Sequence, residues 1–283
     1  MVSTVKVYRP NTLKDACTVL AEASNQIVNG GTCLSPTVKY GRALGPLLDL
    51  SRLKELKAIQ MADDGVRIGG RITWSEIATA VLPPCFDALK QAARNVGSIQ
   101  IQNVGTVAGN LCNASSAADG VPPLLAVDAE VELVSSAGQR RIGLSNFIVG
   151  DRKTLRRDDE ILTAIVVPRT IDAGASVFFK LGARSFLTTS IVTVAVVIER
   201  DAMAHAGQVR IAVGSCSPVA QRLRKLEHRL VGKRAEPGLG DVAVEADLAA
   251  LSPGDDVQAT AAYRRQAAFT LVRRAIDACI GVS

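Results

Sequence analysis

The chain has 283 residues, of which 48% are hydrophobic and 21% charged, so its composition excludes an intrinsically disordered protein. Its length favours two or three folding units. The net charge is +6, from 33 Lys and Arg against 27 Asp and Glu, which is mild for this length and does not by itself indicate a nucleic-acid-binding surface.

The first unit, residues 1–56, is expected to be a small α/β unit. Asn11 and Thr12 predict a helix start, and the apolar positions that follow fall on one helical stripe: Leu13, Ala16, Cys17, Leu20 and Ala21. Strands are expected at 26–28, running into Gly30-Gly31, and at 47–50. A short helix is expected near Pro36.

The second unit, residues 57–170, mixes hairpins with helices. A hairpin over 57–69 is expected to turn at Asp63-Asp64-Gly65, and Thr73 to Glu76 has the pattern of a capping box. The other predicted elements are helices over 83–95 and 121–127, a strand pair over 130–134 and 140–144, and a strand over 161–167.

The third unit, residues 171–283, places strands before helices, which is typical of an α+β domain. Strands over 175–183, 191–200 and 207–214 predict an antiparallel sheet. Helices are expected over 217–231, 241–251 and 261–280.

The six cysteines lie far apart in the sequence, which excludes CxxC zinc sites and the usual ferredoxin spacings. We expect them to be buried thiols of a reducing compartment. The N-terminus has no apolar signal core, and no apolar run is long enough to span a bilayer. These features predict a soluble, cytoplasmic protein with no membrane span.

Catalytic motifs are nearly absent. The two histidines, His205 and His228, are expected at the surface, and GxSxG, HExxH, GK[ST] and GxGxxG patterns do not occur. Basic segments at 152–157, 222–234 and 264–274 lack interleaved aromatic residues and are expected to be mainly solvated helix faces. We therefore expect no catalytic residue and no metal ligand in this chain, and chemistry supplied by a cofactor.

Two glycine-bearing stretches carry most of the information: residues 28–32 and 103–110. Each is expected to follow a β-like apolar run, and glycine lets the main chain approach a diphosphate closely. A Gly-Gly pair alone is usually just a turn. The stretch from Gly105 to Asp119 is expected to be a long loop, and Asp119 could accept hydrogen bonds from ribityl hydroxyls. The two stretches together predict FAD bound between two subdomains.

These residues resemble a known family. The segments VNGGTCL at 28–34, NVGTVAGNLCNASSAAD at 103–119 and FFKLGARS at 178–185 are similar to motifs of the FAD-binding medium subunits of molybdenum hydroxylases, the xanthine dehydrogenase and carbon monoxide dehydrogenase family. The resemblance covers essentially the whole chain. It implies an α+β fold, in which a two-subdomain FAD-binding domain of the vanillyl-alcohol-oxidase (PCMH) type precedes an α+β C-terminal domain.

The resemblance also implies roles for individual residues toward a noncovalently bound FAD. The diphosphate would be wrapped by Val28, Asn29, Gly30, Gly31, Thr32, Cys33 and Leu34. It would be covered from the other side by Thr106, Gly109 and Asn110, with Asn113 in the same motif. Asp119 would hold ribityl hydroxyls, and Ile161 and Leu162 would pack near the adenine or the ring system. Lys180 would lie at the flavin pyrimidine edge and stabilise reduced flavin, although a solvated strand lysine is an equal alternative.

Three positions depart from the family pattern. Ala108 stands where a second glycine is usual, Ser116 replaces a frequent proline, and Cys33 takes a position that is more often polar or acidic. We do not expect them to abolish FAD binding.

In that family the medium subunit takes electrons from a [2Fe–2S] cluster onto FAD and passes them to an external acceptor. The resemblance implies as partners a large molybdopterin subunit and a small subunit with two [2Fe–2S] clusters, assembled as a dimer of heterotrimers. Two alternatives stay open: a stand-alone flavin oxidoreductase of the same fold and a basic nucleic-acid-binding protein. The sequence does not specify the substrate or the electron acceptor.

Overall fold

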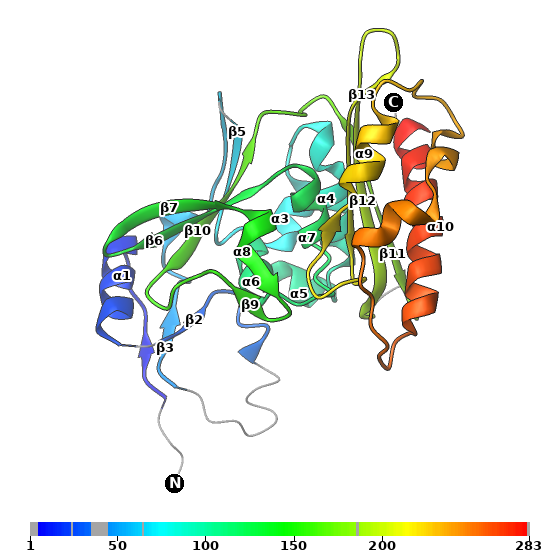
Figure 1. Cartoon of the computed structure of the whole chain (residues 1–283). Helices are drawn as coiled ribbons and strands as arrows, with labels where there is room; N and C mark the ends of the chain where they lie inside the picture. The colour runs from blue at the N-terminus through cyan, green and yellow to red at the C-terminus, as the bar shows by residue number, and fades with distance from the viewer. Residues whose placement is uncertain (1–4, 24, 35–44, 64, 185–186, 282–283) are drawn as a thin grey trace.

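Three larger β-sheets and the helices between them are arranged in layers across the molecule (Figure 1). The computed structural model describes residues 5–23, 25–34, 45–63, 65–184 and 187–281. The expected α+β class is confirmed.

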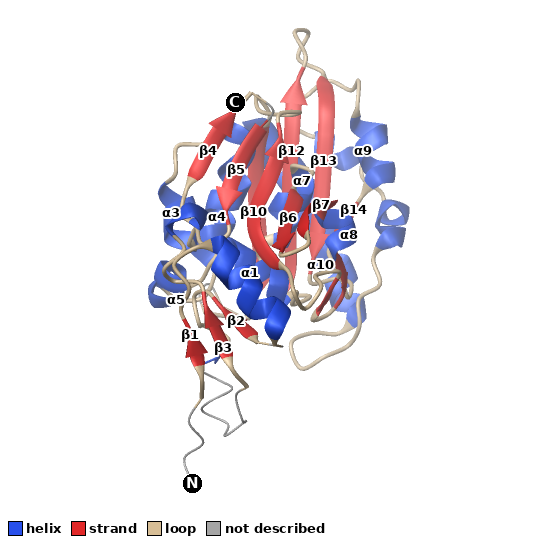
Figure 2. Cartoon of the chain, turned by 90° about the vertical axis from the view of Figure 1, so that its left-hand side faces the viewer, coloured by secondary structure: helices blue, strands red, loops and turns tan. Residues whose placement is uncertain are grey.

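The first sheet is small and parallel, with strand order β1-β3-β2. Its strands are β1 (Val7–Tyr8), β2 (Gln26–Val28) and β3 (Leu47–Asp49). Helix α1 (Leu13–Glu22) is capped as expected, because the Thr12 hydroxyl accepts a hydrogen bond from the Asp15 N–H at 3.1 Å. Its buried stripe packs beside β3 and against the second sheet (Figure 2). The helix expected near Pro36 lies outside the described residues.

The second sheet is antiparallel throughout, with strand order β4-β5-β10-β6-β7. Both expected hairpins form: Ala62 pairs with Gly65 in the first, and Ser135 pairs with Gly138 in the second. The strands are β4 (Ile59–Ala62), β5 (Gly65–Gly69), β6 (Glu130–Ser135), β7 (Gly138–Gly143) and β10 (Ile161–Pro168). A small separate hairpin pairs β8 (Ile148–Gly150) with β9 (Lys153–Thr154).

A layer of helices lies between the second and third sheets (Figure 1). It contains α3 (Trp74–Thr79), α4 (Asp87–Asn95) and α7 (Val121–Ala126). The capping box at Thr73 is confirmed: the Thr73 N–H donates to Glu76 at 2.8 Å, and the Glu76 N–H donates to the Thr73 hydroxyl at 3.4 Å. A turn of 3₁₀-helix (Pro84–Phe86) precedes α4, and α8 (Leu144–Phe147) follows β7.

Two expectations around the second glycine stretch are wrong. The apolar run before Gly105 is helix α5 (Ile99–Val104), because Ser98 caps it and its alternating isoleucines are exposed rather than buried on one face of a sheet. The expected loop contains helix α6 (Val107–Asn113), because Thr106 caps it and it buries Val107, Ala108 and Leu111.

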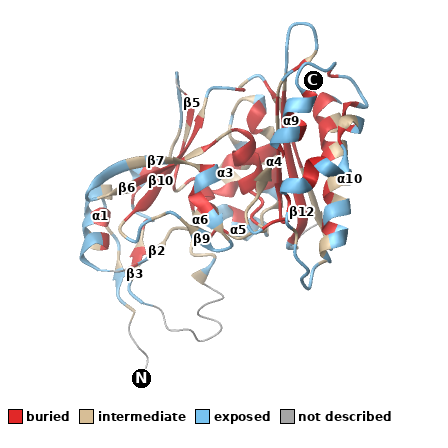
Figure 3. Cartoon of the chain, viewed as in Figure 1, coloured by how far each residue is buried: buried red, intermediate tan, exposed pale blue. Residues whose placement is uncertain are grey.

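The third sheet is antiparallel, as expected, with strand order β11-β12-β13-β14. Its main strands are β11 (Ala175–Gly182), β12 (Ser190–Arg200) and β13 (Ala206–Gly214). Along β12, Val194 and Val196 pack in the core under helix α10 (Ala261–Gly281), whereas Ala195 and Val197 pack in the core shared with α4 and α7. Both faces of this sheet are therefore buried (Figure 3).

The predictions of helices over 217–231 and 241–251 are partly wrong. Within 217–231 only α9 (Arg224–Leu230) is helical, because β14 (Gln221–Arg222) pairs with β13. The segment 241–251 forms 3₁₀ turns at Leu239–Val242 and Glu245–Ala250 instead of an α-helix. The Asp247 carboxylate caps the second turn at the Val244 N–H and binds Arg229, so side-chain contacts determine its geometry.

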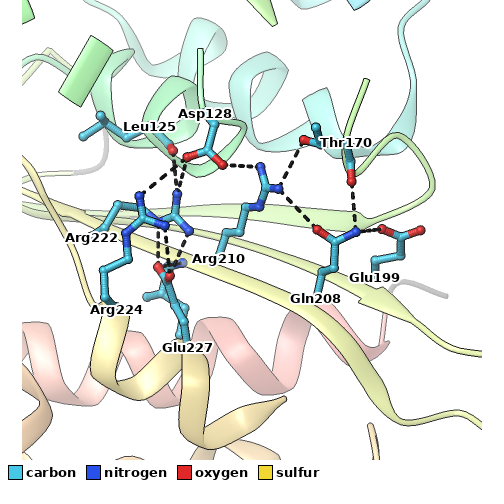
Figure 4. Close-up of polar contacts among 10 residues, drawn as sticks. Leu125, Asp128, Thr170, Glu199, Gln208, Arg210, Arg222, Arg224 and Glu227 are labelled. Carbon is cyan, nitrogen blue, oxygen red and sulfur yellow. Dashed lines mark hydrogen bonds and ion pairs between the residues drawn. The ribbon is translucent and has the colours of Figure 1, made fainter. Parts of the chain in front are cut away.

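A cluster of charged side chains joins the helical layer to the third sheet (Figure 4). Asp128, just after α7, lies 2.6 Å from Arg210 of β13 and accepts a hydrogen bond from Arg222 of β14 at 2.8 Å. Arg222 also donates to both oxygens of the buried Glu227, at 2.6 and 2.8 Å. The bidentate pair leaves Glu227 compensated inside the protein.

We predict that Arg222→Ala lowers the free energy of unfolding by about 3 kcal/mol, because the buried Glu227 loses its bidentate partner and keeps only the distant Arg224 at 3.9 Å. Chemical denaturation measures this loss. Arg224→Ala is the matched control, since the Arg224 side chain is 59% exposed, and its effect should stay below about 1 kcal/mol. Equal losses in the two variants would contradict the assignment.

Candidate functional site

A cavity of about 460 Å³ opens between the first sheet, helices α5 and α6 and the start of β10. The predicted residues that line it are Val28, Asn29, Gly30, Gly31, Thr32, Cys33, Leu34, Thr106, Gly109, Asn110, Asn113, Ile161 and Leu162. Asp119 and Lys180 are not part of this lining. The structure thus brings the two glycine stretches together around one space.

The first glycine stretch is a turn pressed against the second. A Cβ on Gly30 would overlap the carbonyl oxygen of Val104, and Gly31 has a φ of +68°, which favours glycine. The Asn29 amide donates to the Gly70 carbonyl at 2.8 Å and fixes the turn to the second sheet. No described residue accepts a hydrogen bond from the N–H of Gly30 or Gly31, so these donors are available to a ligand.

The second glycine stretch leaves fewer main-chain N–H groups unpaired than a loop would. The Gly109 N–H donates to the Thr106 hydroxyl at 3.0 Å, and the Val107 N–H donates to the Ile72 carbonyl at 3.1 Å. The side-chain oxygen of Asn110 is buried and has no partner among the described residues. Buried polar atoms are almost always paired, so this oxygen is a candidate ligand contact.

Part of the cavity wall is apolar and includes Ile161 and Leu162, which are almost fully buried. Cys112 of α6 also lines the cavity, and burial raises the pKa of its thiol to about 11 even though the charge of Arg156 opposes the shift. A thiol with this pKa is protonated at neutral pH and is not a nucleophile.

Arg156 is the charged residue, among those described in the cavity lining, that the sequence did not predict. It belongs to the basic segment 152–157, expected to be a solvated surface, yet it lines the cavity beside Ile161. The available signal was its short distance in sequence from the predicted residues 161 and 162. The same segment supplies Arg152, which donates a hydrogen bond to the side-chain oxygen of Asn113.

Asp119 and Lys180 form a buried ion pair elsewhere in the helical layer. Lys180 Nζ lies 2.6 Å from one Asp119 oxygen, and the Ser190 hydroxyl donates to the other at 2.5 Å. Burial raises the pKa of Asp119, and the Lys180 charge and the two hydrogen bonds oppose that shift. The alternative that Lys180 is a solvated strand residue is wrong, because its side chain is only 11% exposed.

Neither histidine belongs to this cavity. His228 is exposed on α9, and His205 lies near the tip of the β12–β13 hairpin, 3.6 Å from Asp201. Within the described ranges no three His, Cys, Asp or Glu side chains gather to form a metal site, and no helix could cross a membrane.

A buried carboxylate organises the loop that carries Arg156. Glu160, whose side chain is 4% exposed, accepts hydrogen bonds from Arg140 at 2.5 and 2.7 Å and from the Arg157 N–H at 2.7 Å. Burial opposes ionisation, but the Arg140 guanidinium and the Arg157 N–H outweigh it and hold the pKa of Glu160 below its ordinary value.

Family models match nearly the whole chain. Residues 3–170 match the FAD binding domain in molybdopterin dehydrogenase, and residues 177–279 match the CO dehydrogenase flavoprotein C-terminal domain. Division at residues 56 and 170 stays a prediction.

Similar proteins carry related descriptions. The nicotinate dehydrogenase FAD-subunit of Eubacterium barkeri is 31% identical over 80% of this chain and 79% of its own. The nicotine 6-hydroxylase medium subunit of Paenarthrobacter nicotinovorans is 29% identical over 96% of both chains. A solved carbon monoxide dehydrogenase from Hydrogenophaga pseudoflava contains a chain that superposes with a TM-score of 0.88 at 25% identity, covering 99% of this chain and 98% of that one.

We predict that Gly30→Ala destabilises the protein by about 1–3 kcal/mol, because the added methyl must push the turn away from the Val104 carbonyl. Thermal or chemical denaturation measures the change. Gly254→Ala is the control, since no atom lies within 4 Å of a Cβ there, and it should change stability by less than about 0.5 kcal/mol. A fully stable Gly30→Ala protein would show that the two stretches are not in contact.

We also predict a pH signature for Glu160. The pKa of Glu160 in the folded protein lies below the ordinary value of about 4.3, so the ionised carboxylate stabilises the fold at pH values above 4.3. This stabilisation is lost as the pH falls through the folded-state pKa. Glu160→Gln should therefore cost about 1.5–3 kcal/mol at pH 7, as for loss of hydrogen bonds to a charged group, and progressively less below about pH 4. Unfolding free energies measured across this range test it. Glu236→Gln is the control, because the Glu236 side chain is 64% exposed in its ion pair with Arg234. Its unfolding free energy should match that of the wild type at every pH. A loss of stability in Glu160→Gln that does not depend on pH would refute the prediction.

Proposed function

The chain belongs to the family of FAD-binding subunits of molybdopterin-dependent dehydrogenases, and on this premise we propose that it binds one FAD noncovalently in the cavity between the glycine stretches. The observation that carries the proposal is the convergence of both stretches on one space with unpaired main-chain donors at Gly30 and Gly31. A volume of about 460 Å³ is within the range of cofactor pockets.

The cavity residues suit the parts of an extended dinucleotide. The N–H groups of the 28–34 turn would bind the diphosphate, with Thr106, Gly109 and Asn110 closing the other side. Ile161 and Leu162 supply an apolar wall for a planar ring. The absence of a histidine near either glycine stretch supports noncovalent binding.

Asp119 and Lys180 would serve the flavin half of the same molecule. Their buried pair lies next to the cavity wall, since Lys180 also donates to the carbonyl of Asn95, the chain neighbour of the lining residue Val96. Asp119 would accept hydrogen bonds from ribityl hydroxyls, and the Lys180 ammonium would stabilise negative charge at the pyrimidine edge.

Bound FAD supplies the exchange of electrons between a one-electron and a two-electron partner. The chain itself would hold the flavin, exclude water from it and control access to it. Electrons would arrive from a [2Fe–2S] cluster of a small subunit, after substrate oxidation on a large molybdopterin subunit, and leave to an external acceptor. We propose that the subunits assemble as a dimer of heterotrimers. We also propose a cytoplasmic location, because the six cysteines, all in the described part of the chain, form no disulfide.

The two alternatives have less support. A stand-alone flavoenzyme needs an acid or base near the flavin, and the described cavity lining contains neither His nor carboxylate. A nucleic-acid surface needs unpaired cations, whereas Arg222, Arg229 and Arg264 of the basic segments are paired with carboxylates.

We predict that the purified full chain is yellow and releases one FAD per chain on acid or heat denaturation, because the cofactor is not covalently attached. Absorbance and chromatography of the released flavin measure this. A colourless chain that takes up no FAD when refolded with it would contradict the proposal.

Isolation from its own cells separates the medium subunit from the stand-alone enzyme. We expect the chain to bring two partner chains, one with molybdenum and one with iron and sulfide. A single yellow chain that turns over alone would instead support the stand-alone enzyme.

A further inference from the structure

One side chain gives the cavity its charge. Among the described residues that line the cavity, Arg156 alone is charged. Its positive charge also reaches Cys112 across the cavity wall, where it opposes the rise in the thiol pKa. A ligand with an anionic group would therefore be placed by Arg156 more than by any other side chain of this lining.

The guanidinium is anchored at one end only. Its Nη1 donates to the carbonyl oxygens of Arg157 and Glu160, each at 2.8 Å, and to that of Asp158 at 3.4 Å. No described carboxylate forms an ion pair with Arg156, and no described residue accepts from its Nε or Nη2. Two donors and an uncompensated charge thus remain for a ligand.

The anchor itself is rigid. Glu160 binds Arg140 and the Arg157 N–H, and Arg140 also donates to the Leu155 carbonyl at 2.8 Å. The residues on either side of Arg156 are therefore fixed to β7 and β10. A cation held in place beforehand loses little side-chain entropy on binding an anion.

We propose that Arg156 binds the diphosphate of FAD through its free Nε and Nη2 groups, and that it makes the site selective for phosphate-bearing flavins over riboflavin. The inference rests on the proposed function and goes beyond it, because it adds a residue outside the glycine stretches and the roles that the family resemblance implies. The fork of an arginine matches the geometry of phosphate oxygens.

Flavin affinity of the full chain, freed of flavin and measured by fluorescence quenching, tests the proposal. Arg156→Gln should weaken FAD binding about ten- to a hundredfold, as expected for loss of a hydrogen bond to a charged group. Its affinity for riboflavin, which has no phosphate, should not change. Rising salt should weaken FAD binding to the wild type more steeply than to the variant.

The matched control is Arg157→Gln, which removes the same charge one residue away, from an exposed side chain outside the cavity lining. It should bind FAD like the wild type. Arg156→Lys keeps the charge without the fork and should bind FAD with intermediate affinity; it replaces Arg156→Gln if the glutamine variant does not fold, as judged by circular dichroism.

The outcomes separate the two proposals. If the wild type binds FAD and Arg156→Gln binds it equally well, only the proposed role of Arg156 is overturned. An equal loss of FAD and riboflavin affinity also overturns it, because the effect is then not on the phosphates. A wild type that takes up no FAD overturns the proposed function and this inference with it.

Discussion

The cavity depends on a main-chain contact that a side chain would prevent. Gly30 lies so close to the carbonyl of Val104 that any Cβ there would overlap it. This approach joins the first sheet to α5 and α6, although β3, the first hairpin of the second sheet and helices α3 and α4 lie between the two segments in the chain. Asn29, through the Gly70 carbonyl, holds the same turn from the other side. The space for a ligand exists because the Gly30 contact with Val104 and the Asn29 hydrogen bond to Gly70 hold the turn in place.

The rest of the fold supplies a rigid wall behind this space. Helices α4 and α7 pack against the third sheet on one side and share a core with the second sheet on the other. The third sheet is covered on its far face by α10, so its strands are apolar on both faces. The Asp128–Arg222–Glu227 contacts add a connection between these layers, because Arg222 donates hydrogen bonds to both carboxylates.

Local signals in the sequence predict the parts of the fold that local physics decides. The Thr12 cap, the Thr73 capping box and the pairing of the two hairpins need only neighbouring residues, and all are present. The sequence does not predict helix α5, because a short alternation of Ile and Gln fits a strand as well as one helical turn. It does not predict helix α6, because the small and amide side chains of that segment also suit a loop. Strand β14 and the Asp119–Lys180 pair depend on partners far along the chain, and Arg156 reaches the cavity only because Glu160 and Arg140 fold its loop inward. No short-range pattern contains that information.

The partly buried thiol of Cys112, in the cavity wall, has a consequence for chemical durability. Reduced flavins that meet oxygen produce peroxide, and peroxide attacks thiolates far faster than thiols. Burial raises the pKa of this thiol to about 11, so the protonated form predominates at neutral pH. A sulfur atom in the wall of the cavity is thereby kept in its less oxidisable, protonated form.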